Sequence, residues 1–157
     1  MIKVGESIPS VKVTIIDGDG ENTVSIADYS ADKKIVLMAL PGAFTPTCSE
    51  AHLPGFVALA DDMKAQGVDV VACLSVNDSF VMSAWQQTQN AKHITMIADG
   101  NADLTKALGL TLETGAFGGT RSQRYSMLLE DGKVTQLNVE PDNELTVSDA
   151  KTILSQL

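Results

Sequence analysis

Cysteine is scarce in this sequence, and its scarcity excludes two classes of protein. The 157 residues contain two cysteines, Cys48 and Cys73, and no Cys-x-x-Cys pair. A small secreted protein held together by disulfides has more cysteines in a shorter chain. The two cysteines and the two histidines also lack the spacing of zinc ligands. We therefore expect neither a disulfide framework nor a metal site, and a prominent cysteine becomes a candidate nucleophile.

Basic residues are few, and long apolar runs are missing. The chain has 11 Lys and Arg against 20 Asp and Glu, which gives a net charge of −9, and the basic residues form no run. Nucleic-acid binding needs clustered Lys and Arg to contact phosphates. No segment approaches the ~20 apolar residues that span a bilayer, and the N-terminus lacks the pattern of a secretory signal. We therefore expect a cytoplasmic protein that binds neither nucleic acid nor membranes.

Aromatic residues are also rare, at 4% of the chain, but hydrophobic residues make up 44% of it. Aliphatic side chains must therefore form most of the core. No repeat, low-complexity tract or linker divides the sequence. A length of 157 residues suits one compact unit, so we expect a single domain over residues 1–157.

The order of strand and helix patterns predicts an α/β domain with a mixed central sheet flanked by helices. Residues 34–40 and 68–76 are apolar runs without alternation, as expected for strands covered on both faces. Two hairpins are predicted, one over residues 11–26 around "DGDG" and one over residues 124–140 around Asp131-Gly132. The remaining expected elements are a strand over 93–99 and helices over 48–66, 78–89, 102–108 and 146–157.

Three local features carry further predictions. Pro54 should kink the helix of residues 48–66 in its second turn. Ser148 or Thr146 should cap the last helix. The glycine-rich stretch 113–120 lacks the ending of a phosphate-binding loop and does not directly follow a strand, so we expect a flexible connection there.

Cys48 lies where a proline-containing loop gives way to a helix. The first turn of a helix has unpaired N–H groups and the positive end of the helix dipole, which favour a thiolate over a thiol. The Thr45 hydroxyl is close enough in a tight turn to reach the sulfur or a bound substrate. Pro41 and Pro46 should stiffen the loop and limit the access of water. These residues make Cys48 a candidate nucleophile, although a buried structural cysteine would fit the local pattern equally well.

Two neighbours of Cys48 could modify its reactivity. Glu50 carries a negative charge that favours the neutral thiol. His52 lies four residues after Cys48, on the same face of the predicted helix, and could be a base or a solvent-side residue. We favour a structural or hydrogen-bonding role for His52, because the helix dipole already provides activation.

The stretch "PGAFTPTCSEAHLPGF", residues 41–56, resembles the active-site signature of the peroxiredoxins. The signature P-x-x-x-T-x-x-C falls on Pro41, Thr45 and Cys48. The longer match through "HLPGF" is similar to the type II branch, which contains atypical and glutaredoxin-dependent members. The segments "VACLSVND", "RYSMLLEDGKV", "LNVEP" and "ILSQL" also match in register, so the resemblance covers nearly the whole chain.

The resemblance implies a thioredoxin-like fold with an added N-terminal β-hairpin. It also implies a thiol-dependent peroxidase that reduces hydrogen peroxide and alkyl hydroperoxides without a metal or organic cofactor. The Cys48 thiolate would attack the terminal peroxide oxygen, giving a sulfenic acid and water or an alcohol. Because negative charge grows on the leaving oxygen, hydrogen-bond donors must point at it. The family supplies them from the threonine, backbone amides and an arginine that matches Arg124 here, with Arg121 as a nearby competitor.

Cys73 is interpreted as a small apolar core residue in the middle of a strand. The alternative is a resolving partner for Cys48, but the family's intramolecular members carry that cysteine near the C-terminus, where residues 140–157 contain none. The resemblance therefore implies a cycle with one cysteine. An external thiol would attack the sulfenic acid, with glutathione and glutaredoxin as the expected reductant and thioredoxin as the alternative.

Two other functions are alternatives to this one. A peroxide sensor or redox relay would oxidise Cys48 and pass the oxidation to a partner protein. A noncatalytic thioredoxin-like binding module would not need the combination of Pro41, Thr45, Cys48 and Arg124. The resemblance also implies a homodimer, in which aromatic groups beside the active-site loop form the interface; Phe44 and Phe80 are the candidates.

Overall fold

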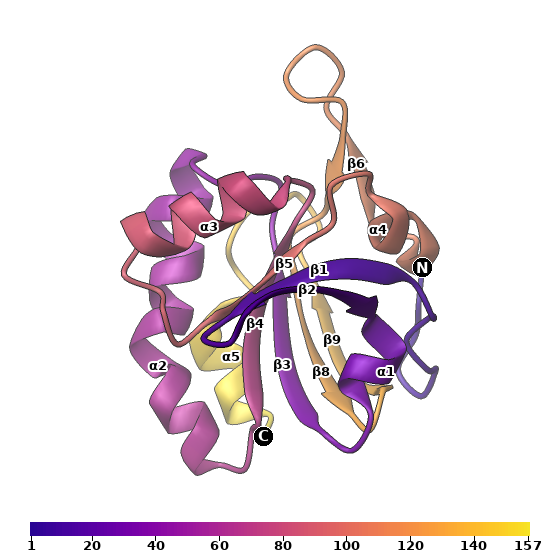
Figure 1. Cartoon of the computed structure of the whole chain (residues 1–157), viewed down its shortest axis with the longest axis vertical. Helices are drawn as coiled ribbons and strands as arrows, with labels where there is room; N and C mark the ends of the chain where they lie inside the picture. The colour runs from indigo at the N-terminus through magenta and orange to yellow at the C-terminus, as the bar shows by residue number, and fades with distance from the viewer.

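The computed structural model describes all 157 residues and is built on a seven-stranded mixed sheet (Figure 1). The strand order is β2-β1-β5-β4-β3-β8-β9. The strands are β1 Lys12–Asp17, β2 Gly20–Ser25, β3 Lys34–Ala39, β4 Val70–Ser75, β5 Thr95–Ala98, β8 Tyr125–Glu130 and β9 Lys133–Val139. The helices are α1 Ile26–Ser30, α2 Leu53–Ala65, α3 Ser79–Thr88, α4 Asp103–Leu108 and α5 Ala150–Ser155, with a π-helix η1 over Cys48–His52.

The sheet confirms the expected α/β class and the N-terminal hairpin. Strands β3, β4 and β5 are parallel, and their connections run through α2 and α3. The β1–β2 hairpin adds to the sheet beside β5, and the β8–β9 hairpin adds beside β3, both antiparallel. No helix combines the length and the apolar character that crossing a membrane requires.

The central strands are apolar on both faces because helices cover both faces of the sheet. On β3, Val36 and Met38 face a core formed with α2, α3 and α5, whereas Ile35 and Leu37 face a second core formed with α1 and α4. Figure 1 shows the same layers, with α2, α3 and α5 grouped on one side of the sheet. The unbroken apolar run of residues 34–40 therefore supplies both cores.

The glycine-rich stretch forms an ordered hairpin where we predicted a flexible connection. Strands β6 (Thr111–Glu113) and β7 (Thr120–Ser122) pair antiparallel, and their tip projects from the body of the molecule (Figure 1). The Thr114 backbone N–H and hydroxyl both donate to the Gly119 carbonyl, at 2.9 and 2.7 Å. Gly115 and Gly119 have positive φ, which is why glycine suits this turn. The strands are three residues long, too short to show a clear alternating pattern in the sequence.

Two helix details bear on the sequence predictions: the helix is irregular near Pro54, where a π-helix is present, and the predicted cap of the last helix is wrong. Pro54 lies directly after the π-helix η1, whose wide turn accommodates the proline at the start of α2. In this turn the Leu53 N–H donates to the Cys48 carbonyl. The last helix is capped by Asp149, whose carboxylate accepts from the Thr152 N–H. Ser148 and Thr146 are unavailable as caps because their hydroxyls donate to a buried carboxylate, that of Glu140.

Candidate active site

The chain turns helical directly after the loop that follows β3, and Cys48 lies in the first turn. The backbone becomes helical at Pro46, where a proline costs nothing because the first helical N–H has no partner within the helix. The Ser49 N–H donates to the Thr45 carbonyl at 2.9 Å and closes this turn. Cys48 therefore occupies the position near a helix N-terminus that the sequence predicted.

The sheet register brings Arg124 to Cys48. Ala39, the last residue of β3, pairs with Tyr125, the first residue of β8. Arg124 precedes β8, so its side chain starts beside the loop that leads from β3 to Cys48. Its Nη2 donates to Cys48 Sγ at 3.3 Å, and both residues are buried, with 3% of Arg124 and none of Cys48 exposed. A guanidinium donor held against a sulfur in a buried site can stabilise negative charge on the sulfur and on an atom bonded to it.

His52 contacts a second nitrogen of the Arg124 guanidinium. Arg124 Nη1 lies 3.0 Å from His52 Nδ1, and His52 Nε2 lies 3.0 Å from the Ser148 carbonyl oxygen. A carbonyl can only accept, so the hydrogen belongs on Nε2, and Nδ1 accepts from the arginine. Burial lowers the pKa of His52 to about 4, and the charge of Arg124 acts in the same direction. The hydrogen bond that His52 donates to the Ser148 carbonyl acts against both. His52 is therefore neutral near pH 7 and makes the hydrogen-bonding contacts that we favoured for it.

Thr45 and Pro41 shape the loop in front of the sulfur. The Thr45 hydroxyl donates to the Gly42 carbonyl at 2.7 Å rather than to Cys48. This bond fixes the hydroxyl while its oxygen keeps a lone pair for another donor. A side chain at Gly42 would come within 3.2 Å of the Thr45 methyl group, so only glycine fits comfortably there. Pro41 is buried beneath the loop, and its peptide bond is trans.

The structure separates the two candidate arginines. Arg121 Nε donates to the Gly118 carbonyl at 2.9 Å, and its Nη1 donates to the Val76 carbonyl at 3.0 Å. These contacts join the tip of the β6–β7 hairpin to the loop between β4 and α3. Arg121 makes no contact with the sulfur, so Arg124 is the arginine beside Cys48.

Sequence reasoning missed two residues that hold the active-site turn. Trp85 is buried, and its Nε1 donates to the Ser49 hydroxyl at 3.0 Å. Asn77 accepts the Ala43 N–H at 3.0 Å and so ties the loop after β3 to the loop after β4. No local pattern marks either residue, because their partners lie more than 30 positions away in the chain.

Cys73 is buried on β4 in the same core as Cys48, and both cysteines are free. Burial raises the pKa of the Cys73 thiol well above its usual value. The neutral form of a thiol is a poor nucleophile and a poor metal ligand. These surroundings fit the interpretation of Cys73 as a core residue. No group of three His, Cys, Asp or Glu side chains is placed to hold a metal ion.

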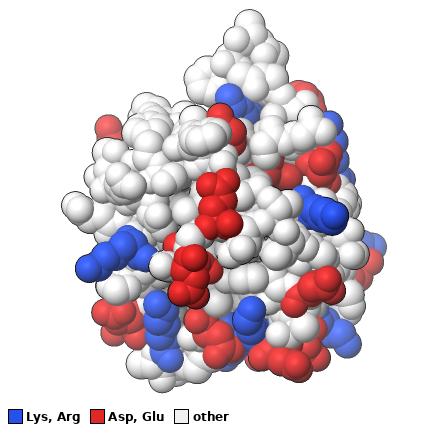
Figure 2. All heavy atoms as spheres, in the orientation of Figure 1, with Lys and Arg blue, Asp and Glu red and all other residues white.

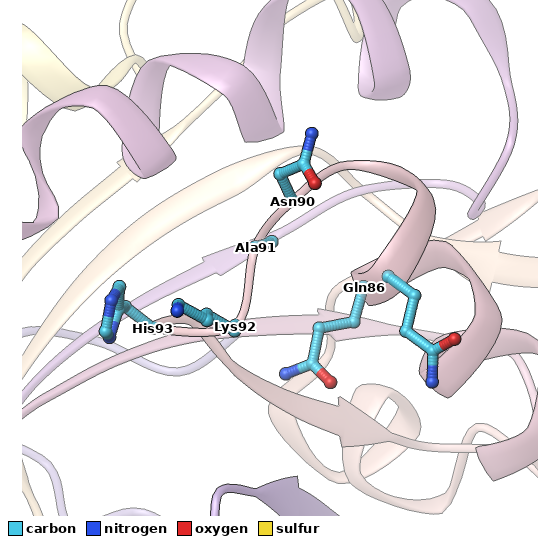
Figure 3. A pocket seen from close by; sticks show the side chains of 6 residues that line it. Gln86, Asn90, Ala91, Lys92 and His93 are labelled. Carbon is cyan, nitrogen blue, oxygen red and sulfur yellow. The ribbon is translucent and has the colours of Figure 1, made fainter.

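A surface hollow is present elsewhere, at the C-terminal end of α3 (Figure 3). It is lined by Gln86, Gln87, Asn90, Ala91, Lys92 and His93. The labelled side chains point in different directions and do not converge on one point. The second histidine of the chain therefore lies outside the Cys48 site.

Comparison with known proteins supports one family. The model of the Redoxin family matches residues 3–154. Peroxiredoxin-2D of Arabidopsis thaliana is 46% identical over 159 aligned positions that cover 99% of this chain and 98% of the plant protein. The reduced Prx3 of Vibrio vulnificus in complex with hydrogen peroxide has a TM-score of 0.96 and 52% identity, and the match covers 99% of each chain. A 1-Cys peroxiredoxin from Plasmodium falciparum has a TM-score of 0.88 and 29% identity, covering 97% of this chain and 96% of that one.

These likenesses extend over the whole sheet and both helical layers, and the fold is therefore thioredoxin-like. The chain belongs to the redoxin family and, within it, is a type II peroxiredoxin, a thiol peroxidase.

Proposed function

We propose that this peroxidase reduces hydrogen peroxide and alkyl hydroperoxides at Cys48, and that an external thiol then recycles the oxidised cysteine. The observation that carries the proposal is the 3.3 Å contact from Arg124 Nη2 to Cys48 Sγ in a buried site. The second cysteine is fixed on a central strand, which leaves Cys48 without a mobile partner in the same chain.

In the first step the Cys48 thiolate attacks the terminal oxygen of the hydroperoxide. The S–O bond forms as the O–O bond breaks, sulfur is oxidised to a sulfenic acid, and the leaving oxygen takes a proton to become water or an alcohol. Arg124 donates to the sulfur and to the departing oxygen as charge develops there. The Thr45 hydroxyl oxygen accepts the O–H of the peroxide, since its own hydrogen is already given to Gly42. Pro41 shields the site from water.

In the second step a thiol from solution attacks the sulfenic acid, releases water and leaves a mixed disulfide on Cys48. A second thiol then reduces this disulfide and frees Cys48. We propose glutathione with glutaredoxin as the reductant, and thioredoxin as the alternative. Support comes from the absence of cysteine in residues 140–157 and from the similarity to a protein described as a 1-Cys peroxiredoxin. Without an internal resolving thiol, excess peroxide would drive Cys48 to the sulfinic acid.

The burial of Cys48 sets a condition on this step. None of the Cys48 surface is exposed, so even a peroxide needs the site to open, and the larger glutathione needs it to open further. The first turn, from Pro46 to the π-helix, must therefore open locally before the mixed disulfide forms. The Trp85–Ser49 hydrogen bond closes that turn and would break as it opens.

The experiment is a comparison of reductants with intact-mass spectrometry. The reduced enzyme receives one equivalent of peroxide and then glutathione, glutathione with glutaredoxin, or a thioredoxin system. We expect one added oxygen on Cys48, then a glutathione adduct, then turnover only when glutaredoxin is present. Turnover with thioredoxin alone, without an adduct, would contradict the glutathione cycle. Oxidation without turnover in any of the three systems would instead favour the sensor or relay function.

We further propose that the enzyme is a cytoplasmic homodimer. Phe44, Phe80 and Phe117 are 54%, 85% and 72% exposed. The surface over α3 and the tip of the β6–β7 hairpin is largely uncharged (Figure 2). Exposed aromatic groups on an uncharged face are typical of an interface. Sedimentation of the protein and of Phe80→Glu tests this: we expect a dimer that the charged variant dissociates, and a monomeric wild-type protein would refute it.

A further inference from the structure

The loop from Pro141 to Ser148 is organised around one buried carboxylate, that of Glu140, which is 3% exposed. Five donor groups of the loop point at it, at distances between 2.7 and 3.0 Å. They are the backbone N–H groups of Thr146, Val147 and Ser148 and the hydroxyls of Thr146 and Ser148. The peptide chain thus wraps around a single anion.

Glu140 remains charged in this position although no lysine or arginine pairs with it. Burial by itself would raise the pKa of the carboxyl group, but the hydrogen bonds from the loop outweigh it and lower the pKa to about 2. A neutral side chain in its place would accept fewer and weaker hydrogen bonds from these five donors, of which the Ser148 N–H is buried. The loop therefore depends on the Glu140 carboxylate for its conformation.

The same loop supplies the contacts that orient Arg124. Arg124 Nε donates to the Asn143 carbonyl at 3.4 Å, and the Ser148 carbonyl accepts from His52, which in turn accepts from Arg124 Nη1. The Glu140 N–H itself donates to the Arg124 carbonyl at 3.0 Å. Two of the three guanidinium nitrogens are thus directed by this loop, and the third is left to point at the sulfur.

We propose that Glu140 is a positioning residue for the peroxidase reaction. Its carboxylate fixes the loop, the loop fixes the carbonyls of Asn143 and Ser148, and these hold the Arg124 guanidinium against Cys48. None of the hydrogen bonds of the Glu140 carboxylate goes to Cys48 or to Arg124. In the sequence, Glu140 belongs to the segment "LNVEP", which carries only a resemblance; its role as a positioning residue follows from its contacts in the fold.

The test uses Glu140→Gln, which keeps the shape of the side chain but replaces one acceptor oxygen with a donor. The matched control is Glu144→Gln, which makes the same charge change at an exposed position of the same loop. Two second-order rates are measured on each reduced protein: oxidation of Cys48 by hydrogen peroxide and its alkylation by iodoacetamide. Iodide needs no hydrogen-bond donor to leave, so alkylation reports on access and thiolate, whereas oxidation also needs the arginine in place.

We expect Glu140→Gln to slow oxidation by about 10- to 100-fold, the loss typical of a displaced reacting group. Alkylation should fall much less, and Glu144→Gln should change neither rate. Equal losses in the two reactions would overturn the proposal, because they would show a general disturbance of the Cys48 turn. Thermal unfolding of each variant sets an assay temperature at which all of them are folded.

A double-mutant cycle tests whether the effect passes through Arg124. In an Arg124→Lys background the guanidinium is already gone, so Glu140→Gln should slow oxidation little further. Additive losses would contradict the proposed path.

If Glu140→Gln does not fold, Ser148→Ala replaces it, since this change removes one donor to Glu140 and keeps the carbonyl. We expect a smaller drop in the ratio of the two rates, and an unchanged ratio would overturn the proposal.

Discussion

Replacement of Arg124 by lysine tests the geometry of the site most directly, because it keeps the charge and removes the forked donors. Arg124 is 3% exposed and uses separate nitrogens for Cys48, His52 and Asn143. A lysine has one donor group, and it cannot keep all three contacts in that arrangement. Removal of one preorganised donor from a developing oxyanion costs roughly 100- to 1000-fold in rate, or about 3–4 kcal/mol. Since the lysine retains its charge, we expect the lower end, about 100-fold.

The assay mixes reduced enzyme with excess peroxide, quenches the reaction with an alkylating agent, and follows the sulfenic acid by intact mass. Arg121→Lys is the comparison, since this arginine contacts only Gly118 and Val76 among the backbone carbonyls. We expect it to lower the free energy of unfolding by about 1 kcal/mol and to affect the oxidation rate far less than Arg124→Lys does. A peroxide rate for Arg124→Lys equal to that of the wild type, or one matched by Arg121→Lys, would refute the reasoning.

Three further outcomes are expected. Cys48→Ser should abolish peroxide consumption and Cys73→Ser should retain most of it in a steady-state assay; equal losses would refute the one-cysteine cycle. The single tryptophan, Trp85, should shift its fluorescence emission to longer wavelength when Cys48 forms a mixed disulfide, and an unchanged spectrum would argue against opening of the first turn. The free energy of unfolding should fall by about 3 kcal/mol in total as the pH drops from 6.5 to about 4, because His52 takes up a proton on unfolding. The free energy of unfolding should fall further as the pH drops below 4.5 towards about 2, where Glu140 titrates. In urea denaturation, His52→Gln should lose the pH dependence between 6.5 and about 4 and keep the dependence below 4.5.

Local patterns in the sequence were sufficient for most of the fold. The apolar runs of β3 and β4 predicted strands covered on both faces, and Asp131-Gly132 predicted the hairpin of β8 and β9, where both residues have positive φ. These features depend on residues that are neighbours in the chain, so a window of about ten residues contains the signal. The β6–β7 hairpin was missed because its strands are too short to give an alternating pattern in the sequence.

Helix ends were predicted less well, because a hydroxyl can serve more than one partner. Ser148 and Thr146 have the side chains of helix caps, yet the structure uses both to bind Glu140 and leaves the cap to Asp149. Similarly, Pro54 signals an irregular helix, but the form of the irregularity depends on how the turn at Cys48 packs.

The sequence by itself determined the order of the seven central strands along the chain, the position of Cys48 in a first helical turn, and the chemistry that its signature implies. Tertiary structure alone decided which arginine meets the sulfur, how His52 accepts from it, and that Glu140 organises the loop behind both. The contact from Arg124 to Cys48 joins positions 76 residues apart, and that from His52 to Ser148 joins positions 96 residues apart. Such contacts follow from the register between β3 and β8 and from the closure of the loop after β9, and no nearby residues in the chain encode either one.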